Sequence, residues 1–272
     1  MGSFSGEVVK GYKLDQKIPE FRAGQNNIFK VQGVTRSSSG KEFSVLICTQ
    51  ADINQMISDK TDQERIWNLA ILEAKNLLKL KHPSLLRVED KIFEEPSRIV
   101  VVIERVYGTL ATLFQDVFTS QGGESQIVMD LENEEEEARN NIKNLLNALK
   151  FVNKDLKYCH WGVSPESIFL AGNLKSWKLG GFGLMRGFGK VEEESLKPNL
   201  YFASYEHFSG ANSRSDLFSF GLVALKYFIY IYHLRNSKFP ENGGNKRTGQ
   251  IQALGFGRNS KFVYSSRKIS GR

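Results

Sequence analysis

Short apolar runs separated by turn residues dominate the first hundred positions of the chain. They predict antiparallel strands over residues 12–18, 28–34, 42–48, 85–93 and 99–106. The stretch 62–81 differs, because its apolar residues recur every three or four positions until Pro83 and therefore predict an amphipathic helix. The pattern indicates a β-rich lobe with one helix that ends near Tyr107.

A helical pattern follows Tyr107. Helices are expected over residues 109–118, around 142–152 and over 216–232, and a hairpin is expected between 168–170 and 177–179 around Gly172-Asn173. The last helix resembles a membrane span, but Ser219, Gly221 and Lys226 interrupt it and it is shorter than the usual ~20 residues. We therefore expect a buried core helix.

These elements divide the chain into three parts. We expect a small β-rich lobe over residues 10–107, a partial helical lobe over 108–235 and a basic, disordered tail over 236–272. The tail is rich in Gly, Asn, Ser and Lys and has no apolar periodicity, which is typical of a solvated segment.

The net charge of +7 comes from the end of the chain, within 272 residues of ordinary apolar and charged content. From His233 onward there are nine Lys or Arg and one acid, which leaves 28 basic and 29 acidic residues in 1–232. Because phosphate binding needs a basic folded face, we expect no specific nucleic-acid partner. A binder of anionic surfaces that acts through the tail is an alternative, and removal of residues 236–272 would abolish such binding.

Cys48 and Cys159 are the only cysteines, and neither has the spacing of a disulfide framework or a zinc site. We therefore expect a reducing, cytoplasmic location. The N-terminus lacks the apolar core of a signal peptide, and Gly2 is followed by Gly6 where myristoylation favours Ser or Thr, so a lipid anchor has little support.

Several local sequences, in their order along the chain, resemble the motifs of protein kinases. Residues 73–83 are similar to the end of the kinase C helix, with Glu73 in the place of its ion-pairing acid. Residues 160–167 occupy the catalytic-loop pattern, Gly181-Phe182-Gly183 stands where D-F-G is expected, and residues 216–221 are similar to the start of the F helix. The resemblance covers residues 10–232 and implies an α+β, two-lobed kinase-like fold whose large lobe is truncated after the F helix.

A closer resemblance, carried by residues 82–86, 177–182 and 198–201, is to the SCY-like pseudokinases of the coated-vesicle-associated branch. It implies a catalytically inactive scaffold or adaptor in vesicle trafficking between Golgi, endosomes and clathrin coats. The implied partners are proteins, coat or adaptor proteins among them, and the implied location is cytoplasmic and peripheral on Golgi or endosomal membranes.

The resemblance also assigns the groups needed for phosphoryl transfer to positions where this chain lacks them. Leu46 stands at the third-strand Lys position, and a shifted alignment offers Cys48 there instead. Gly162 replaces the catalytic-loop Asp, Ser167 the metal-binding Asn and Gly181 the metal-binding Asp. We therefore expect no catalytic residue, no metal and no ATP. The alternative is an atypical ATP-binding serine/threonine kinase with relocated catalytic groups.

The remaining cleft is vestigial and consists of Gly24, Leu46 and Glu73. Residues 17–31 hold only Gly24 where a G-x-G-x-x-G loop needs close backbone approach. Glu73, without its Lys, must find another donor or be solvated, and the alternative donors on neighbouring strands are Lys13, Lys17 and Lys30.

Two more residues have a structural interpretation. We expect Asp216 to cap the F helix and to bind the catalytic-loop backbone. His160 is expected in the core, because adjacent residues on a strand point to opposite faces and Cys159 cannot pair with it as a nucleophile. Further helices would be needed to cover an F helix as apolar as residues 218–232, and none is predicted, so we expect an exposed apolar patch and marginal stability.

Overall fold

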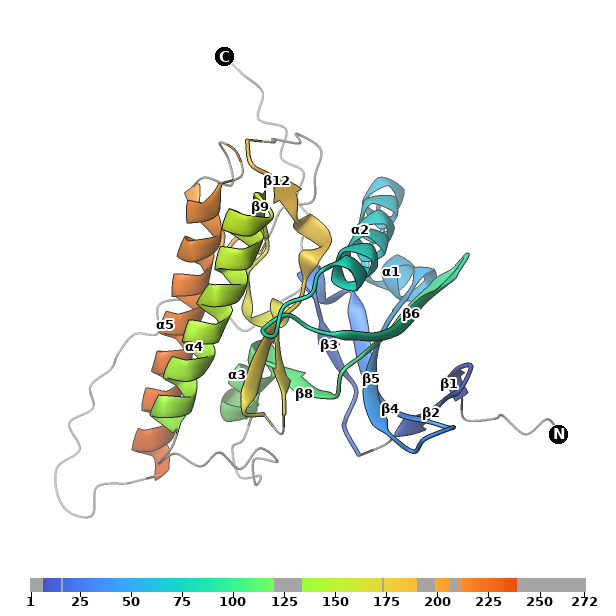
Figure 1. Cartoon of the computed structure of the whole chain (residues 1–272), viewed down its shortest axis with the longest axis horizontal. Helices are drawn as coiled ribbons and strands as arrows, with labels where there is room; N and C mark the ends of the chain where they lie inside the picture. Colours follow the sequence, from blue (N-terminus) through green and yellow to red (C-terminus); the bar gives the residue numbers. More distant parts are fainter. Residues whose placement is uncertain are drawn as a thin grey trace.

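A computed structural model gives the structure of this chain and describes residues 7–15, 17–119, 134–172, 174–189, 199–205, 210 and 212–238. The described part has two lobes (Figure 1). One lobe holds an antiparallel sheet with helices α1 (Gln50–Met56) and α2 (Lys60–Lys79), and the other holds α3 (Leu110–Thr119), α4 (Glu134–Lys150) and α5 (Ser213–Lys238), with α4 and α5 in contact. The α+β, two-lobed kinase-like architecture expected from the sequence is confirmed.

The first lobe is built on one antiparallel sheet in the order β1-β2-β4-β5-β7-β6, with β3 also paired to β4. Its strands are β1 (Glu7–Val9), β2 (Tyr12–Asp15), β3 (Phe21–Ala23), β4 (Phe29–Arg36), β5 (Glu42–Thr49), β6 (Val88–Glu95) and β7 (Arg98–Ile103). The single strand predicted over 12–18 was wrong, because β2 ends at Asp15 and β3 begins only at Phe21. Pro19 lies between them and has no amide hydrogen to give to a ladder.

Helix α2 (Lys60–Lys79) confirms the helix predicted over 62–81 and packs one stripe of side chains under the sheet. Asp59 caps its first turn by accepting a hydrogen bond from the amide of Asp62 at 3.0 Å. The buried stripe has helical spacing and contains Ile66, Leu69, Ala70, Glu73, Ala74 and Leu77. The short helix α1 (Gln50–Met56) was not predicted, because its seven residues carry too few apolar positions to show a period.

The second lobe begins earlier than predicted. Strand β8 (Val106–Thr109) pairs with β10 (Ile168–Ala171), which pairs with β11 (Ser176–Leu179), so the predicted boundary between residues 107 and 108 cuts through a strand of the second lobe. The hairpin of β10 and β11 is confirmed, although Asn173 lies outside the described residues. The other elements are α3 (Leu110–Thr119), α4 (Glu134–Lys150), a π-helical turn (Phe151–Asp155), β9 (Tyr158–Cys159), β12 (Arg186–Gly187) and α5 (Ser213–Lys238).

The described residues form two apolar clusters, and the larger one joins the two lobes. The larger cluster runs from the inner face of the sheet, through α2, into the second lobe, where it includes Phe169, Phe182 and Trp177. The smaller cluster covers the outer face of the sheet around Phe43 and Val45. Because successive residues of a strand point to opposite faces, β5 supplies alternating side chains to both clusters. The space between the lobes is therefore lined by packed core residues.

Helix α5 is longer than the predicted 216–232 and extends three residues into the stretch assigned to the tail, while residues 239–272 lie outside the described residues. Its residues 213–234 are long and apolar enough to cross a membrane by length and composition, and a third of the tested window is buried inside the protein. The helix is therefore a core helix on one side only. The expected exposed patch is confirmed by the other side, which contains Leu217, Phe218, Leu225, Phe228, Ile229 and Tyr232.

Candidate functional site

Four segments meet where the two lobes join and form the candidate site. They are the loop Gly24–Asn27 after β3, Glu73 in α2, residues 160–167 before β10, and residues 180–184 after β11. The Gly24 amide donates a hydrogen bond to the carbonyl oxygen of Glu166 at 3.0 Å. The site is therefore closed by a direct backbone contact between the lobes.

Gly24 lets the loop approach α2 closely. Its φ of 76° lies in the left-handed region, and a Cβ atom there would lie 3.0 Å from the ring of Phe29 and 3.2 Å from Oε1 of Glu73. Asn26 and Asn27 also have positive φ, which asparagine adopts more readily than most residues. The structure thus brings Gly24 and Glu73 together at the predicted cleft, with the loop folded inward.

Gln25 fills the centre of this site, and no motif pointed to it. Its side chain is buried, and Nε2 donates a hydrogen bond to the carbonyl oxygen of Gly162. A Cβ atom on Gly162 would overlap the Gln25 side chain, and one on Gly181 would lie 2.7 Å from Cβ of Ser167. Gln25 therefore occupies the space that a side chain at position 162 would need.

Glu73 is fully buried and has no cationic partner among the described residues. Its Oε1 accepts a hydrogen bond from the amide of Gly181 at 3.1 Å, and its Oε2 has no hydrogen-bond partner in the described part of the chain. Burial raises the pKa of Glu73 to about 8, an effect that the backbone amides of Gly181 and Gln25 oppose without cancelling. At neutral pH the Glu73 side chain is therefore predominantly a neutral carboxylic acid.

None of the three lysines suggested as substitutes forms an ion pair with Glu73, and two of them pair with other carboxylates. Nζ of Lys17 lies 2.5 Å from Glu42, and Nζ of Lys30 lies 2.6 Å from Asp52. Lys13 is exposed on β2 and makes no ion pair with Glu73. The alternative of a relocated lysine is thus not realised in this geometry, and Glu73 finds its other donor in the Gly181 amide.

The strand β5 places both candidates for the missing Lys position on one face. Leu46 pairs with Val31 and Val101 in the neighbouring strands and is packed in the larger core. Cys48 is packed in the same core, where burial, and after it the negative charge of Asp52, raises the pKa of its thiol to about 12. Neither position therefore supplies a cation.

His160 and Ser167 are satisfied by backbone groups of their own lobe. His160 is buried, with Nε2 2.8 Å from the carbonyl oxygen of Gly180 and Nδ1 accepting from the Gly162 amide at 3.2 Å. Burial lowers the pKa of His160, which keeps the ring neutral. The Ser167 hydroxyl donates to the Ser164 carbonyl at 2.8 Å and accepts from the Ser164 amide at 3.0 Å. His160 is confirmed as a core residue.

Asp216 organises the loop that carries these residues. One carboxylate oxygen accepts from the His160 amide at 2.7 Å and from Asn153 Nδ2 at 2.8 Å, and the other accepts from the Trp161 amide at 2.9 Å. The expected bond to the catalytic-loop backbone is therefore confirmed. The helix cap was assigned wrongly, because Asn212 accepts from the Arg214 amide at 2.8 Å and caps α5, whereas Asp216 lies one turn inside it.

The segment that links the lobes is also bound internally. The hydroxyl of Ser44 accepts from the Val106 amide at 3.1 Å and lies 3.3 Å from the Val106 carbonyl oxygen. Next to it, Arg105 forms an ion pair with Asp15 at 2.7 Å, and both side chains are largely buried. The backbone at the joint therefore already has side-chain partners.

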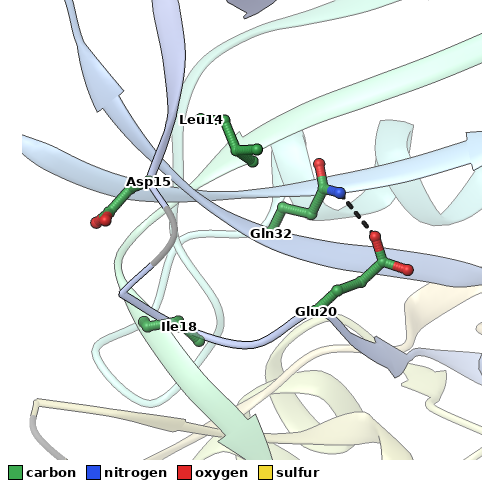
Figure 2. Close-up of a pocket in the computed structure, with 5 residues that line it drawn as sticks. All are labelled: Leu14, Asp15, Ile18, Glu20 and Gln32. Atoms are coloured by element: carbon green, nitrogen blue, oxygen red, sulfur yellow. Dashed lines mark hydrogen bonds between the residues drawn. The ribbon is translucent and has the colours of Figure 1, made fainter. Parts of the chain in front are cut away.

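A surface pocket of the first lobe lies between β2, β4 and the segment that joins β2 to β3. It is lined by Leu14, Asp15, Ile18, Glu20 and Gln32, and Nε2 of Gln32 donates to Glu20 at 2.7 Å across it (Figure 2). Neither Gly24 nor Glu73 lines this pocket. The pocket is therefore separate from the candidate site.

The residues of the candidate site do not fit a magnesium–nucleotide complex. Magnesium requires carboxylate or phosphate oxygens in octahedral geometry, and positions 162 and 181 carry no side chain. No group of three or more His, Cys, Asp or Glu is gathered for a metal in residues 7–238 apart from the undescribed gaps. The carboxyl group that is present, Glu73, is held by a backbone amide.

A family model described as protein kinase domain matches residues 35–261. The match begins after Gly24 and Gln25, and it extends beyond α5 into residues outside the described part. "Protein kinase-like protein SCY1" of Saccharomyces cerevisiae is 26% identical over 153 residues, which is 56% of this chain and 16% of that protein.

Two other relatives are similar over longer stretches. "SCY1-like protein 2" of Mus musculus is 21% identical over 222 residues, which is 75% of this chain and 24% of the relative. "Probable serine/threonine-protein kinase nek2" of Dictyostelium discoideum is 32% identical over 205 residues, which is 70% of this chain and 44% of the relative. The chain thus spans less than half the length of these curated relatives.

Proposed function

Because this chain belongs to the protein kinase domain family, we propose that it is a catalytically inactive, SCY-like kinase domain that works as a scaffold or adaptor through its surfaces. The observation that carries the proposal is the position of Gln25. Its side chain lies against Gly162, where the resemblance assigns the catalytic-loop carboxylate, and it seals the space between that loop and Gly181.

The chemistry of phosphoryl transfer supports this choice. Transfer of a phosphoryl group depends on positioning and on neutralising charge with a lysine and with magnesium held by carboxylate and amide oxygens. Here Cys48 is a neutral thiol, Gly162 and Gly181 have no side chains, and the Ser167 hydroxyl is bound to Ser164. These positions therefore contribute to packing and hydrogen bonding within the domain, and none supplies a charged group for phosphoryl transfer.

A thermal-shift titration of the full chain with ATP, with and without magnesium, tests the proposal. We expect no shift of the melting temperature with either, because a ligand stabilises only the state that binds it. The Gln25→Ala variant is the matched probe: it removes the side chain that seals the site and leaves the rest of the loop. Stabilisation of the unmodified chain that requires both ATP and magnesium, together with phosphate transfer to a protein acceptor, would overturn the proposal.

An active kinase with relocated catalytic groups is the second candidate, and the observation that favours it is the 32% identity to the nek2 relative. This candidate predicts turnover that a carboxylate in the described lobes supports. If the buried carboxyl group of Glu73 performs the chemistry, Glu73→Gln should abolish this turnover. Absence of phosphate transfer from the unmodified chain would contradict the active-kinase candidate and would favour the scaffold.

The cellular role that we propose is in vesicle trafficking, on the cytoplasmic face of Golgi, endosomal or clathrin-coated membranes. The support is the similarity to the SCY1 and SCY1-like relatives and the motifs shared with that family. Microscopy of the tagged chain with clathrin and Golgi markers tests it. Co-localisation is the expected result, and an even cytosolic distribution would contradict the assignment to membranes while leaving the inactivity of the site a separate question.

A further inference from the structure

The loop Gly24–Asn27, which we call the interlobe loop, is fastened to the second lobe by two hydrogen bonds. The Gly24 amide donates to the carbonyl oxygen of Glu166 at 3.0 Å, and the Gln25 side chain donates to the carbonyl oxygen of Gly162. The loop itself joins β3 to β4, which pair from Phe21–Ala23 to Phe29–Val31 on either side of it. It can therefore leave the second lobe while the two strands stay paired.

The closed position of the interlobe loop has a conformational cost. Asn26 and Asn27 have φ values of 56° and 55°, so two consecutive residues with side chains lie in the left-handed region. Nδ2 of Asn26 is buried and has no hydrogen-bond partner among the described residues. Both features raise the free energy of the closed position, and they bring it closer to that of an open position in which the loop relaxes into water.

Glu73 lies directly beneath the interlobe loop. A Cβ atom on Gly24 would lie 3.2 Å and 3.3 Å from the two carboxyl oxygens of Glu73. The side chain is fully buried, and Oε2 has no hydrogen-bond partner in the described part of the chain. Its other neighbours are the Gly181 backbone and the packed residues of the larger apolar cluster. Movement of the interlobe loop is therefore the smallest change that would admit water to Glu73.

Charged groups do not hold the Glu73 carboxyl group in the described part of the chain. Burial raises its pKa, the backbone amides of Gly181 and Gln25 lower it, and no charged side chain contributes. The thiol of Cys48, on β5, stays neutral to about pH 12, and burial keeps the ring of His160 neutral. The charged residues on the elements packed against α2 are half-exposed or exposed, or are paired elsewhere: Glu42, Asp52, Glu89, Asp90, Lys91, Glu94, Glu95 and Arg98.

The proton on Glu73 therefore decides how stable the closed position is. In the closed position, ionisation would bury a negative charge without a cation, and the pKa of Glu73 is about 8. In the open position water reaches the carboxyl group, and its pKa returns toward the ordinary 4.5. Because the closed-state pKa is the higher one, closure is most favourable below pH 4.5 and weakens as the pH rises to 8.

We propose that the interlobe loop is a pH-dependent latch between the two lobes, closed over the protonated Glu73 and released when Glu73 loses its proton. Release withdraws the Gln25 side chain from Gly162 and opens the candidate site to solvent. Access to the site then rises with pH. The proposal concerns how the site opens and not what it does, so it is independent of the proposed function.

Amide hydrogen exchange of the full chain between pH 6 and 8 tests the latch. The exchange rate of each amide, divided by its intrinsic rate at the same pH, gives an opening constant that is free of the direct effect of pH. The opening constant of the Gly24 amide should rise at least tenfold from pH 6 to 8, because release is coupled to the loss of one proton. The amide of Val101, in a strand paired on both sides, reports global unfolding and should have a smaller opening constant at every pH.

Three variants separate the switch from the fastening. Glu73→Gln keeps an acceptor and cannot ionise, so the opening constant of the Gly24 amide should stay within about twofold over the whole interval. Glu64→Gln, at an exposed position of the same helix, is the matched control and should keep the full rise. Gln25→Ala removes a bond between the lobes and leaves Glu73 in place, so it should raise the opening constant roughly fivefold at every pH and keep the rise.

Three results would overturn the latch. Equal opening constants for the Gly24 and Val101 amides would show that the interlobe loop opens only when the domain unfolds. An opening constant of the Gly24 amide that does not change with pH in the unmodified chain would show that no proton is coupled to release. A rise that Glu73→Gln retains would assign the proton to another group. None of these measurements uses a nucleotide, so their failure is distinct from a failure of the proposed function.

Discussion

The side-chain amide of Gln25 donates a hydrogen bond to the carbonyl oxygen of Gly162 and lies in the space that a side chain at position 162 would occupy. The two residues come from different lobes and are 137 positions apart in the chain. A single glutamine thus fastens the loop of the first lobe to the catalytic-loop segment of the second. Glycine at position 162 therefore has two consequences: it leaves the loop without the catalytic carboxylate, and it gives the Gln25 side chain the space that it occupies.

A double-mutant cycle tests this contact. Gly162→Asp should lower the free energy of unfolding by about 1–3 kcal/mol, because the new side chain overpacks a filled site. In the Gln25→Ala background the same substitution should cost less by about 1 kcal/mol, since the space is then available. Urea unfolding of the four proteins measures the coupling. Gln32→Ala, at a glutamine bound to Glu20 outside the site, should show additive behaviour with Gly162→Asp. Additivity in both cycles would refute the packing argument.

The bonds of Asp216 predict a large loss of stability on a small chemical change. Asp216→Asn keeps the shape of the side chain but replaces one accepting oxygen with an NH₂ group, which faces a backbone amide that also donates. We therefore expect the free energy of unfolding to fall by about 3–5 kcal/mol. Asp62→Asn in the first turn of α2 is the control and should change stability by about 0.5 kcal/mol or less. Denaturant unfolding measures both. A loss below about 1 kcal/mol at Asp216 would show that the loop does not depend on it.

The sequence predicted the secondary-structure elements of this protein better than the contacts between its lobes. Strands β4 to β7, helix α2 and the hairpin followed from apolar periodicity, because burial of one face fixes that period. Asp216 and the burial of His160 followed from the kinase resemblance together with the strand geometry. The exposed face of α5 followed from its apolar residues on every side.

The contacts across the lobes could not be read in this way. Gln25 looks like an ordinary loop residue in the sequence, and its role depends on a partner 137 positions away. The acid form of Glu73 follows from its burial and from a donor that is a backbone amide, and neither has a sequence signal.

The joint between the lobes gives a third prediction. Ser44 hydrogen-bonds both the amide and the carbonyl of Val106, so Ser44→Ala leaves a buried amide without a partner. We expect a loss of about 1–3 kcal/mol in the free energy of unfolding. Ser39→Ala, in an exposed turn, is the matched control and should be close to neutral. Thermal unfolding of both variants checks the difference, and equal melting temperatures would contradict the role of Ser44.

The raised pKa of Glu73 predicts how stability depends on pH. Its folded-state pKa of about 8 lies above the ordinary 4.5, so between these values the folded state keeps a proton that the unfolded state releases. The contribution of Glu73 is therefore fully present below pH 4.5 and is lost as the pH rises toward 8. From pH 6.5 to 8 we expect the free energy of unfolding to fall by about 1–2 kcal/mol.

Urea unfolding between pH 6.5 and 8 measures this slope with little interference from histidine. Burial lowers the pKa of His160 and of His82, and groups of that kind act below about pH 6.5 and in the opposite direction. Glu73→Gln keeps an acceptor for the Gly181 amide and cannot ionise, so its stability should be nearly constant over the same interval. Glu64→Gln, at an exposed position of α2, should keep the slope of the unmodified chain. If Glu73→Gln kept that slope too, the buried acid would not be its source.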